Sequence, residues 1–130
     1  MWYRILPFVL GALISLNALA QIAAQKDSAN GVTVTVTPGN LAGDAKVWDF
    51  AVVLDTHSQD ISDDLAKSAV LKDDKGNEFK AIGWEGAAPG GHHRAGVLKF
   101  NPVTPRPQAV ELRIDRPDEA KARVFHWNLQ

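Results

Sequence analysis

The sequence predicts an all-β protein, an immunoglobulin-like β-sandwich of about seven antiparallel strands that follows an N-terminal signal segment. Three observations carry this prediction. Short segments alternate apolar and polar residues with a period of two, which places one set of side chains on a buried sheet face. Turn-forming Pro, Gly, Asn and Asp separate these segments. After the signal segment no stretch has an extended helical pattern, and strands spaced in this way are typical of a sandwich or a small barrel.

Residues 1–20 have the organisation of a secretory signal peptide. Arg4 provides a short positive region, an apolar stretch follows, and residues 18–20 (Ala-Leu-Ala) form a small-x-small cleavage pattern. Cleavage there would start the mature protein at Gln21. An uncleaved membrane anchor is the alternative, because apolar character resumes at residues 22–24 and lengthens the segment towards the roughly 20 residues that a bilayer needs. We expect a periplasmic or extracellular protein, with membrane association only if the segment stays uncleaved.

The sandwich domain is predicted to span residues 31–130. Before it, residues 21–30 are small and polar without periodicity, so we expect a flexible leader. Valine and threonine alternate strictly over residues 32–37, and both favour strands because they are branched at Cβ. Residues 47–54 form the next predicted strand, whose large apolar side chains share one face and are core candidates: Trp48, Phe50, Val52 and Leu54.

The middle of the chain is predicted to hold one short helical turn and a hairpin. Ser62 is a possible N-cap, with residues 63–64, both aspartates, in the first turn. Residues 69–72 and 78–84 then form two strands around a turn in which Gly76 takes a positive φ.

Three more strands complete the predicted domain, over residues 97–100, 110–114 and 123–129. Alternation directs the following side chains inward: Leu98, Phe100, Val110, Leu112, Ile114, Phe125, Trp127 and Leu129. A single domain is expected, because 130 residues lie well below the roughly 250 at which one core splits into two.

Composition narrows the classes of function. The content of 45% hydrophobic and 22% charged residues is that of an ordinary globular protein. The net charge of −1 provides no basic field, so nucleic acid is not an expected partner. With no cysteine, the chain has no disulfide and no thiolate zinc site. Any metal would need histidine, carboxylate or carbonyl ligands, and zinc or copper is the expected ion.

Two segments contain the candidate metal-binding residues. Residues 84–96 combine four glycines and a proline with Glu85 and with the adjacent His92 and His93. Imidazole is a common ligand of zinc, copper and nickel, and two neighbouring histidines on an irregular loop can converge as they cannot on a strand. The ordinary alternative is a loop whose polar side chains contact only water.

The second segment, Asp55-Thr56-His57-Ser58, follows the strand of residues 47–54. If the strand continues, Asp55 and His57 point to the same side and can share one ligand. The predicted metal site therefore consists of His57, His92, His93, Asp55 and Glu85. The aspartates at 60, 63 and 64 lack the spacing of an EF-hand loop, which makes calcium a weaker alternative. His126 alternates with inward-facing neighbours and is expected on the surface.

The chain resembles a family of small exported prokaryotic proteins with an immunoglobulin-like β-domain. The resemblance lies in residues 53–58, 83–86, 89–94 and 96–100. The resemblance covers most of the mature chain. It implies an exported β-domain and assigns no catalytic role to any residue.

The sequence contains no catalytic motif of the types G-x-S-x-G, H-E-x-x-H or G-x-x-x-x-G-K-[ST], so an enzyme is not expected. We expect an exported non-enzymatic binding or accessory module for a protein or small ligand, with a divalent metal bound through loop histidines. The alternative is a structural or adhesive module that pairs with another protein through edge strands or through residues 84–96. The metal hypothesis requires the His57 segment to lie within ligand distance of His92 or His93.

Overall fold

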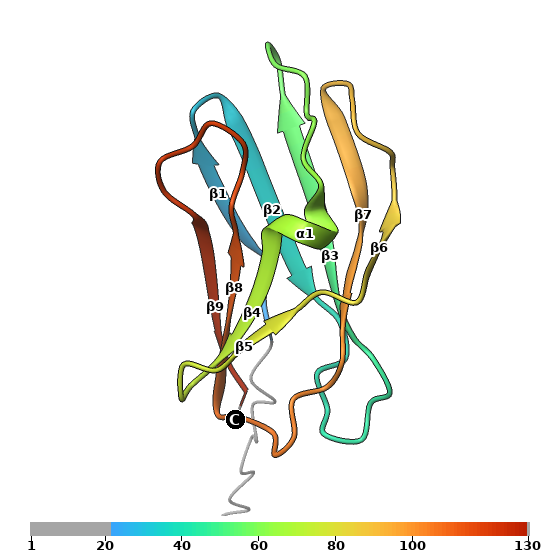
Figure 1. The fold of residues 1–130 in the computed structure, drawn as a ribbon, viewed down its shortest axis with the longest axis vertical. Coiled ribbons are helices and arrows are strands. Elements are labelled where there is room, and N and C mark those ends of the chain that lie inside the picture. The colour runs from blue at the N-terminus through green and yellow to red at the C-terminus, as the bar shows by residue number, and fades with distance from the viewer. Residues whose placement is uncertain (1–21, 130) are drawn as a thin grey trace, which may run out of the picture.

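The computed structural model describes residues 22–129, so the predicted signal segment lies outside the described residues. The strands are β1 (Gln25–Ala29), β2 (Val32–Pro38), β3 (Trp48–Thr56), β4 (Ala69–Asp73), β5 (Glu78–Lys80), β6 (Gly83–Gly86), β7 (His93–Phe100), β8 (Ala109–Ile114) and β9 (Arg123–Asn128), with one helical turn, α1 (Leu65–Ser68). They form two antiparallel sheets, in the orders β1-β2-β3-β7-β6 and β5-β4-β8-β9 (Figure 1). The prediction of an all-β sandwich is confirmed.

The strand order bears on the predicted subclass. Without β1 and β5, seven strands remain in chain order, and they form sheets of β2-β3-β7-β6 and β4-β8-β9. This is the arrangement of the strands A-B-E-D and C-F-G in constant-type immunoglobulin domains. The immunoglobulin-like subclass stays a prediction, which this order supports.

The core lies between the two sheets, where the alternating pattern predicted it. The side chains expected to point inward are all buried: Trp48, Phe50, Val52, Leu54, Leu98, Phe100, Val110, Leu112, Ile114, Phe125, Trp127 and Leu129. Phe50 of β3 packs edge-on against Phe100 at a centroid distance of 5.6 Å, and it also contacts Trp127 of the opposite sheet at 5.6 Å. Apolar contact across the two sheets therefore holds the sandwich together.

The expectation of a flexible leader over residues 21–30 is wrong for its second half, because residues 25–29 form β1 and pair with β2. The strand has no apolar face, and its side chains are exposed or half-buried. Asn30 and Gly31 turn the chain, with φ of 52° and 76°. Positive φ at both positions defines the type I′ hairpin turn, for which Asn-Gly is the strongest sequence signal.

The strand predicted over residues 78–84 is two strands in two different sheets. β5 pairs with β4, and Gly76 in the turn between them has the predicted positive φ, at 84°. The chain then crosses to the other sheet, where β6 pairs with β7. Apolar content alone does not reveal such a crossing, because both strands present apolar residues to the same core.

Two other boundaries differ from the predicted ones. The helical turn begins at Leu65 after an N-cap at Asp64, so Ser62 is not its cap and Asp63 precedes the helix. β7 begins at His93 rather than at residue 97. No helix within residues 22–129 is long and apolar enough to cross a membrane.

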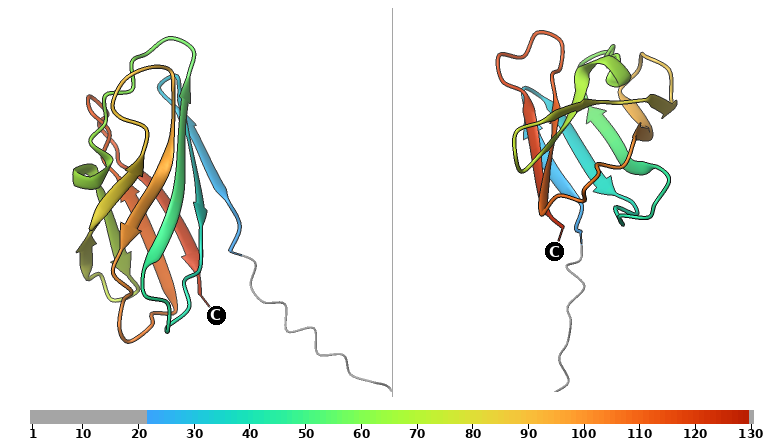
Figure 2. Two further views of the ribbon diagram at one scale, coloured as in Figure 1. Left: turned by 90° about the vertical axis from the view of Figure 1, so that its right-hand side faces the viewer. Right: turned by 60° about the horizontal axis from the view of Figure 1, so that its bottom comes forward.

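The two ends of the sandwich are distinct. β1 begins at the end where β9 finishes, near the C-terminus (Figure 2). β3 finishes and β7 begins at the opposite end, together with the loop that precedes α1 (Figure 1).

Candidate functional site

β3 and β7 bring the two candidate segments together. Asp55 is the register partner of His93, and beyond the strands the Thr56 N–H donates to the carbonyl of His92 at 2.9 Å. We use the term histidine end for Asp55, His57, His92 and His93. The two candidate segments are therefore neighbours in the fold.

Further hydrogen bonds connect the loops beyond the strands. The Ile61 N–H donates to the Gly91 carbonyl at 2.9 Å, and the Gly90 N–H donates back to the Ile61 carbonyl at 2.8 Å. The Asp60 carboxylate accepts from the Gly91 N–H at 2.7 Å. Because these bonds join the two loops residue by residue, the histidine end has a defined backbone geometry.

Asp55 and His93 form a direct side-chain contact at the surface. Nδ1 of His93 is hydrogen-bonded to Oδ1 of Asp55, with 66% of the His93 side chain and 52% of the Asp55 side chain exposed. A carboxylate accepts hydrogen bonds, so the proton of a neutral His93 lies on Nδ1 and the lone pair of Nε2 is available. β3 ends at the buried Thr56, and His57 follows it as an exposed residue in a bend.

The other two predicted ligands do not join this contact. His93 is the first residue of β7 and not part of an irregular loop, and His92 lies in the bend before the strand, where it is exposed. Glu85 pairs in register with Val97, four positions along β7 from His93, or about 13 Å away at ~3.3 Å per residue. Its carboxylate lies 3.4 Å from the ammonium of Lys99. Within residues 22–129, no group of three or more acidic or histidine side chains is arranged around a metal position.

The glycines of residues 84–96 have structural roles that explain much of this segment's composition. Gly86 and Gly96 are register partners, and a Cβ on Gly86 would clash with the Cα of Gly96. A Cβ on Gly96 would lie 2.5 Å from the indole of Trp84. The Trp84 ring therefore packs over the glycine pair, and its Nε1–H donates to the Ala87 carbonyl at 3.0 Å.

Arg94 supports the histidine end from inside. Its side chain is 1% exposed, and its guanidinium donates to the carbonyls of Asp63 at 2.7 Å and Ala87 at 3.2 Å. The guanidinium carbon lies 5.7 Å from the centroid of Trp84, a cation–π distance. A single buried residue thus holds both loops that carry the histidines.

A second cluster, whose side chains are largely buried, lies at the same end of the fold. Arg116 donates two hydrogen bonds of 2.9 Å to the Asp63 carboxylate and a third, of 2.7 Å, to Glu119. Arg123 of β9 donates to Glu119 at 2.7 and 2.9 Å and to the Val32 carbonyl of β2 at 3.2 Å. We call Asp63, Arg116, Glu119 and Arg123 the ion cluster. It links both sheets to the loop between β8 and β9.

The ion cluster shifts the acid–base equilibria of Glu119 and Arg116. The Arg123 hydrogen bonds lower the pKa of the Glu119 carboxyl most strongly; burial opposes this and Arg116 adds to it. Burial would by itself lower the pKa of Arg116, but the carboxylates of Asp63 and Glu119 outweigh it and raise that pKa. Both shifts favour the charged forms of Glu119 and Arg116.

The alternation of apolar and polar residues does not predict the ion cluster. One signal was available: Glu119 lies three residues after Arg116 and four before Arg123, and charges of opposite sign at such spacing often pair. The spacing applies to helices, however, and this segment is a loop.

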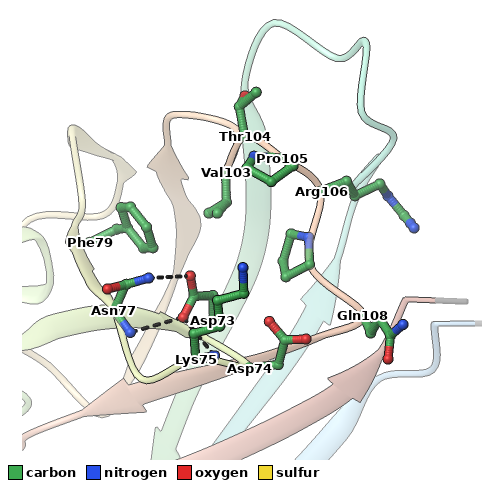
Figure 3. Close-up of a pocket in the computed structure, with 11 residues that line it drawn as sticks. Asp73, Asp74, Lys75, Asn77, Phe79, Val103, Thr104, Pro105, Arg106 and Gln108 are labelled. Carbon is green, nitrogen blue, oxygen red and sulfur yellow. Dashed lines mark hydrogen bonds between the residues drawn. The ribbon is translucent and has the colours of Figure 1, made fainter.

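The other end of the sandwich carries an open pocket (Figure 3). It has a volume of about 410 Å³ and lies between the β4–β5 turn and the loop between β7 and β8. Its walls contain charged, amide and apolar side chains, among them Asp74, Lys75, Phe79, Val103 and Gln108.

Comparison with known proteins assigns no relationship: no family model, no curated protein and no solved structure matches this chain.

Proposed function

We propose that the protein is a non-enzymatic binding module that acts outside the cytoplasm and binds a divalent transition metal at its histidine end. His93 and His57 are the proposed ligands, and Asp55 orients His93. The single observation that carries the proposal is the contact between Asp55 and His93, two exposed residues from strands far apart in the sequence. The extracytoplasmic location rests on the signal-like pattern of residues 1–20.

The Asp55–His93 contact has the chemistry of a metal ligand with its supporting carboxylate. Histidines that bind metals usually donate their second ring N–H to a carboxylate, which fixes the ring and makes the other nitrogen more basic. Nε2 of His93 would hold the ion, and the exposed His57, two residues beyond Asp55, would provide the second imidazole. Two imidazoles leave coordination positions for water or for a partner's ligand, and copper(II) should bind more tightly than zinc.

The test is a calorimetric titration of copper(II) and zinc into untagged protein that begins at Gln21. We expect binding at about pH 7.5 that weakens strongly at about pH 5, because only the neutral imidazole is a ligand. His93→Ala should abolish binding, and Asp55→Asn should weaken it about 10- to 100-fold. His126→Ala is the matched control, since His126 is an exposed histidine on the other sheet. Equal affinities of the wild type and His93→Ala would refute the proposal.

One observation favours the adhesive alternative. Ile82, directly before the edge strand β6, is 54% exposed, and a sheet edge with an adjacent apolar side chain can pair with another protein. The edge on the other side is less accessible, because the Gln25 side chain of β1 bonds to the backbone of His126 in β9. If the titration shows no metal binding, the β6 edge becomes the better candidate for the functional surface.

A further inference from the structure

The pocket in Figure 3 lies at the end of the sandwich opposite the histidine end, and its walls are already formed. In the β4–β5 turn, the Asp73 carboxylate accepts hydrogen bonds from the Lys75 N–H at 3.0 Å, the Asn77 N–H at 2.8 Å and the Asn77 side-chain amide at 2.9 Å. In the facing loop, Arg106 donates to the carbonyls of Leu41, at 2.9 Å, and Leu129. A ligand would therefore meet a prearranged surface, which lowers the entropic cost of binding.

Four polar side chains of the lining are available to a ligand. Within residues 22–129 no side-chain hydrogen bond or ion pair is formed by Asp74, Lys75, Thr104 or Gln108, and Figure 3 shows Asp74 and Lys75 extending from the turn towards the loop. The apolar part of the lining consists of the half-buried Phe79 together with Val103, Pro105 and Pro107. The lining combines apolar with polar surface, of which the polar part is the larger, and 410 Å³ lies within the usual range of roughly 300–1,000 Å³ for a small-molecule site.

The charges of the lining balance. Asp73 and Asp74 are negative, Lys75 and Arg106 are positive, and the pocket therefore has no net field to attract an ion of either sign. The groups that remain available include donors and acceptors. This combination suits a neutral ligand that carries several hydroxyl groups and one apolar face.

We propose that this pocket binds a neutral saccharide unit. The apolar face of the sugar ring would pack on Phe79 and the prolines, and its hydroxyls would bond to Asp74, Lys75 and Gln108. A peptide strand fits less well, because turn and loop segments line the pocket and β5 has only three residues. Main-chain pairing needs a longer strand edge. This site is independent of the proposed metal site.

The test is a nuclear magnetic resonance titration of isotope-labelled protein that begins at Gln21, with maltotriose, cellotriose and chitotriose as probes. We expect at least one sugar to shift the backbone amides of residues 74–77 and 104–108. Asp74→Ala and Gln108→Ala should each weaken its affinity up to about tenfold, the effect of one hydrogen bond to a neutral group. Glu78→Ala is the matched control: Glu78 is exposed on the same hairpin but does not line the pocket. His93→Ala should not affect sugar binding.

Two outcomes would overturn the proposal. The first is that none of the three sugars shifts these amides at millimolar concentration, or that the shifts map to another surface. The second is that trilysine or triglutamate peptide shifts the same amides while the sugars do not, which would make the pocket a site for charged peptides.

Discussion

Asp63 and Asp64 are chemically identical neighbours with opposite environments. The Asp63 side chain is fully buried and forms two hydrogen bonds with Arg116. The Asp64 side chain is 59% exposed, and its closest cation is Lys67 at 3.8 Å. Removing one partner of a buried ion pair is costly because it leaves the other charge without compensation, whereas an exposed pair contributes little.

This contrast gives the first stability prediction. Asp63→Asn keeps the side-chain shape but removes the charge that faces Arg116, and it should lower the free energy of unfolding by about 3 kcal/mol. Urea unfolding followed by tryptophan fluorescence measures the change. Asp64→Asn is the control and should change stability by less than about 0.5 kcal/mol. If the two variants lose similar amounts of unfolding free energy, the buried ion pair between Asp63 and Arg116 does not contribute more than the exposed pair.

At the scale of single elements, β6 depends on the absence of two Cβ atoms. Trp84 packs over Gly96, and Gly86 lies against the same residue across the β6–β7 pair. The glycines in residues 84–96 are thus partly explained by the close approach of two strands and one indole ring, and not only by loop formation.

Gly96→Ala should displace Trp84 and weaken the β6–β7 pair. The new Cβ would lie 2.5 Å from the indole and 2.7 Å from the Glu85 carbonyl, so the expected loss of stability is about 1–3 kcal/mol, as for other overpacked sites. Faster hydrogen exchange at the β6 amides would locate the effect. Gly83→Ala is the matched control, because a Cβ at that position meets no atom within 4 Å. Unchanged exchange in Gly96→Ala would contradict the packing argument.

At the scale of the whole molecule, the ion cluster links the two sheets at one end of the core. Arg123 belongs to the four-stranded sheet and donates to backbone carbonyls of the five-stranded sheet, including Ala29 at 2.8 Å. Glu119 joins Arg123 to Arg116. The charge state of Glu119 should therefore affect the stability of the complete sandwich.

Acid should destabilise the protein through Glu119. Its folded-state pKa lies below the ordinary value of 4.5, so the stabilisation is complete above that pH and is lost as the pH falls through the lower, folded-state pKa. Melting temperatures measured between about pH 7 and pH 2.5 test this expectation. Glu119→Gln should be less stable than the wild type at neutral pH, and the difference should shrink in acid. A difference that is constant across this range would contradict the assignment.

The sequence by itself determined the fold class and the inward-facing side chains. The directions of successive side chains along a strand follow from local covalent geometry, so the period-two pattern predicted the burial of residues such as Trp48, Phe50 and Trp127 correctly. The sequence also contains the Asn30-Gly31 signal for the hairpin turn between β1 and β2. The polar composition of β1 nevertheless led to the prediction of a flexible leader.

Only the tertiary structure decided which of the candidate residues lie together. Strand neighbours and register result from packing between distant segments. This packing places Asp55 opposite His93, whereas Glu85 lies opposite Val97, four positions farther along β7. The same long-range pairing decided that Asp63 is buried and Asp64 exposed. The pocket between the β4–β5 turn and the loop after β7 likewise exists only because the fold brings two polar segments of ordinary composition to the same end. Such contacts have no local signature, since they depend on which strands pair and in which register.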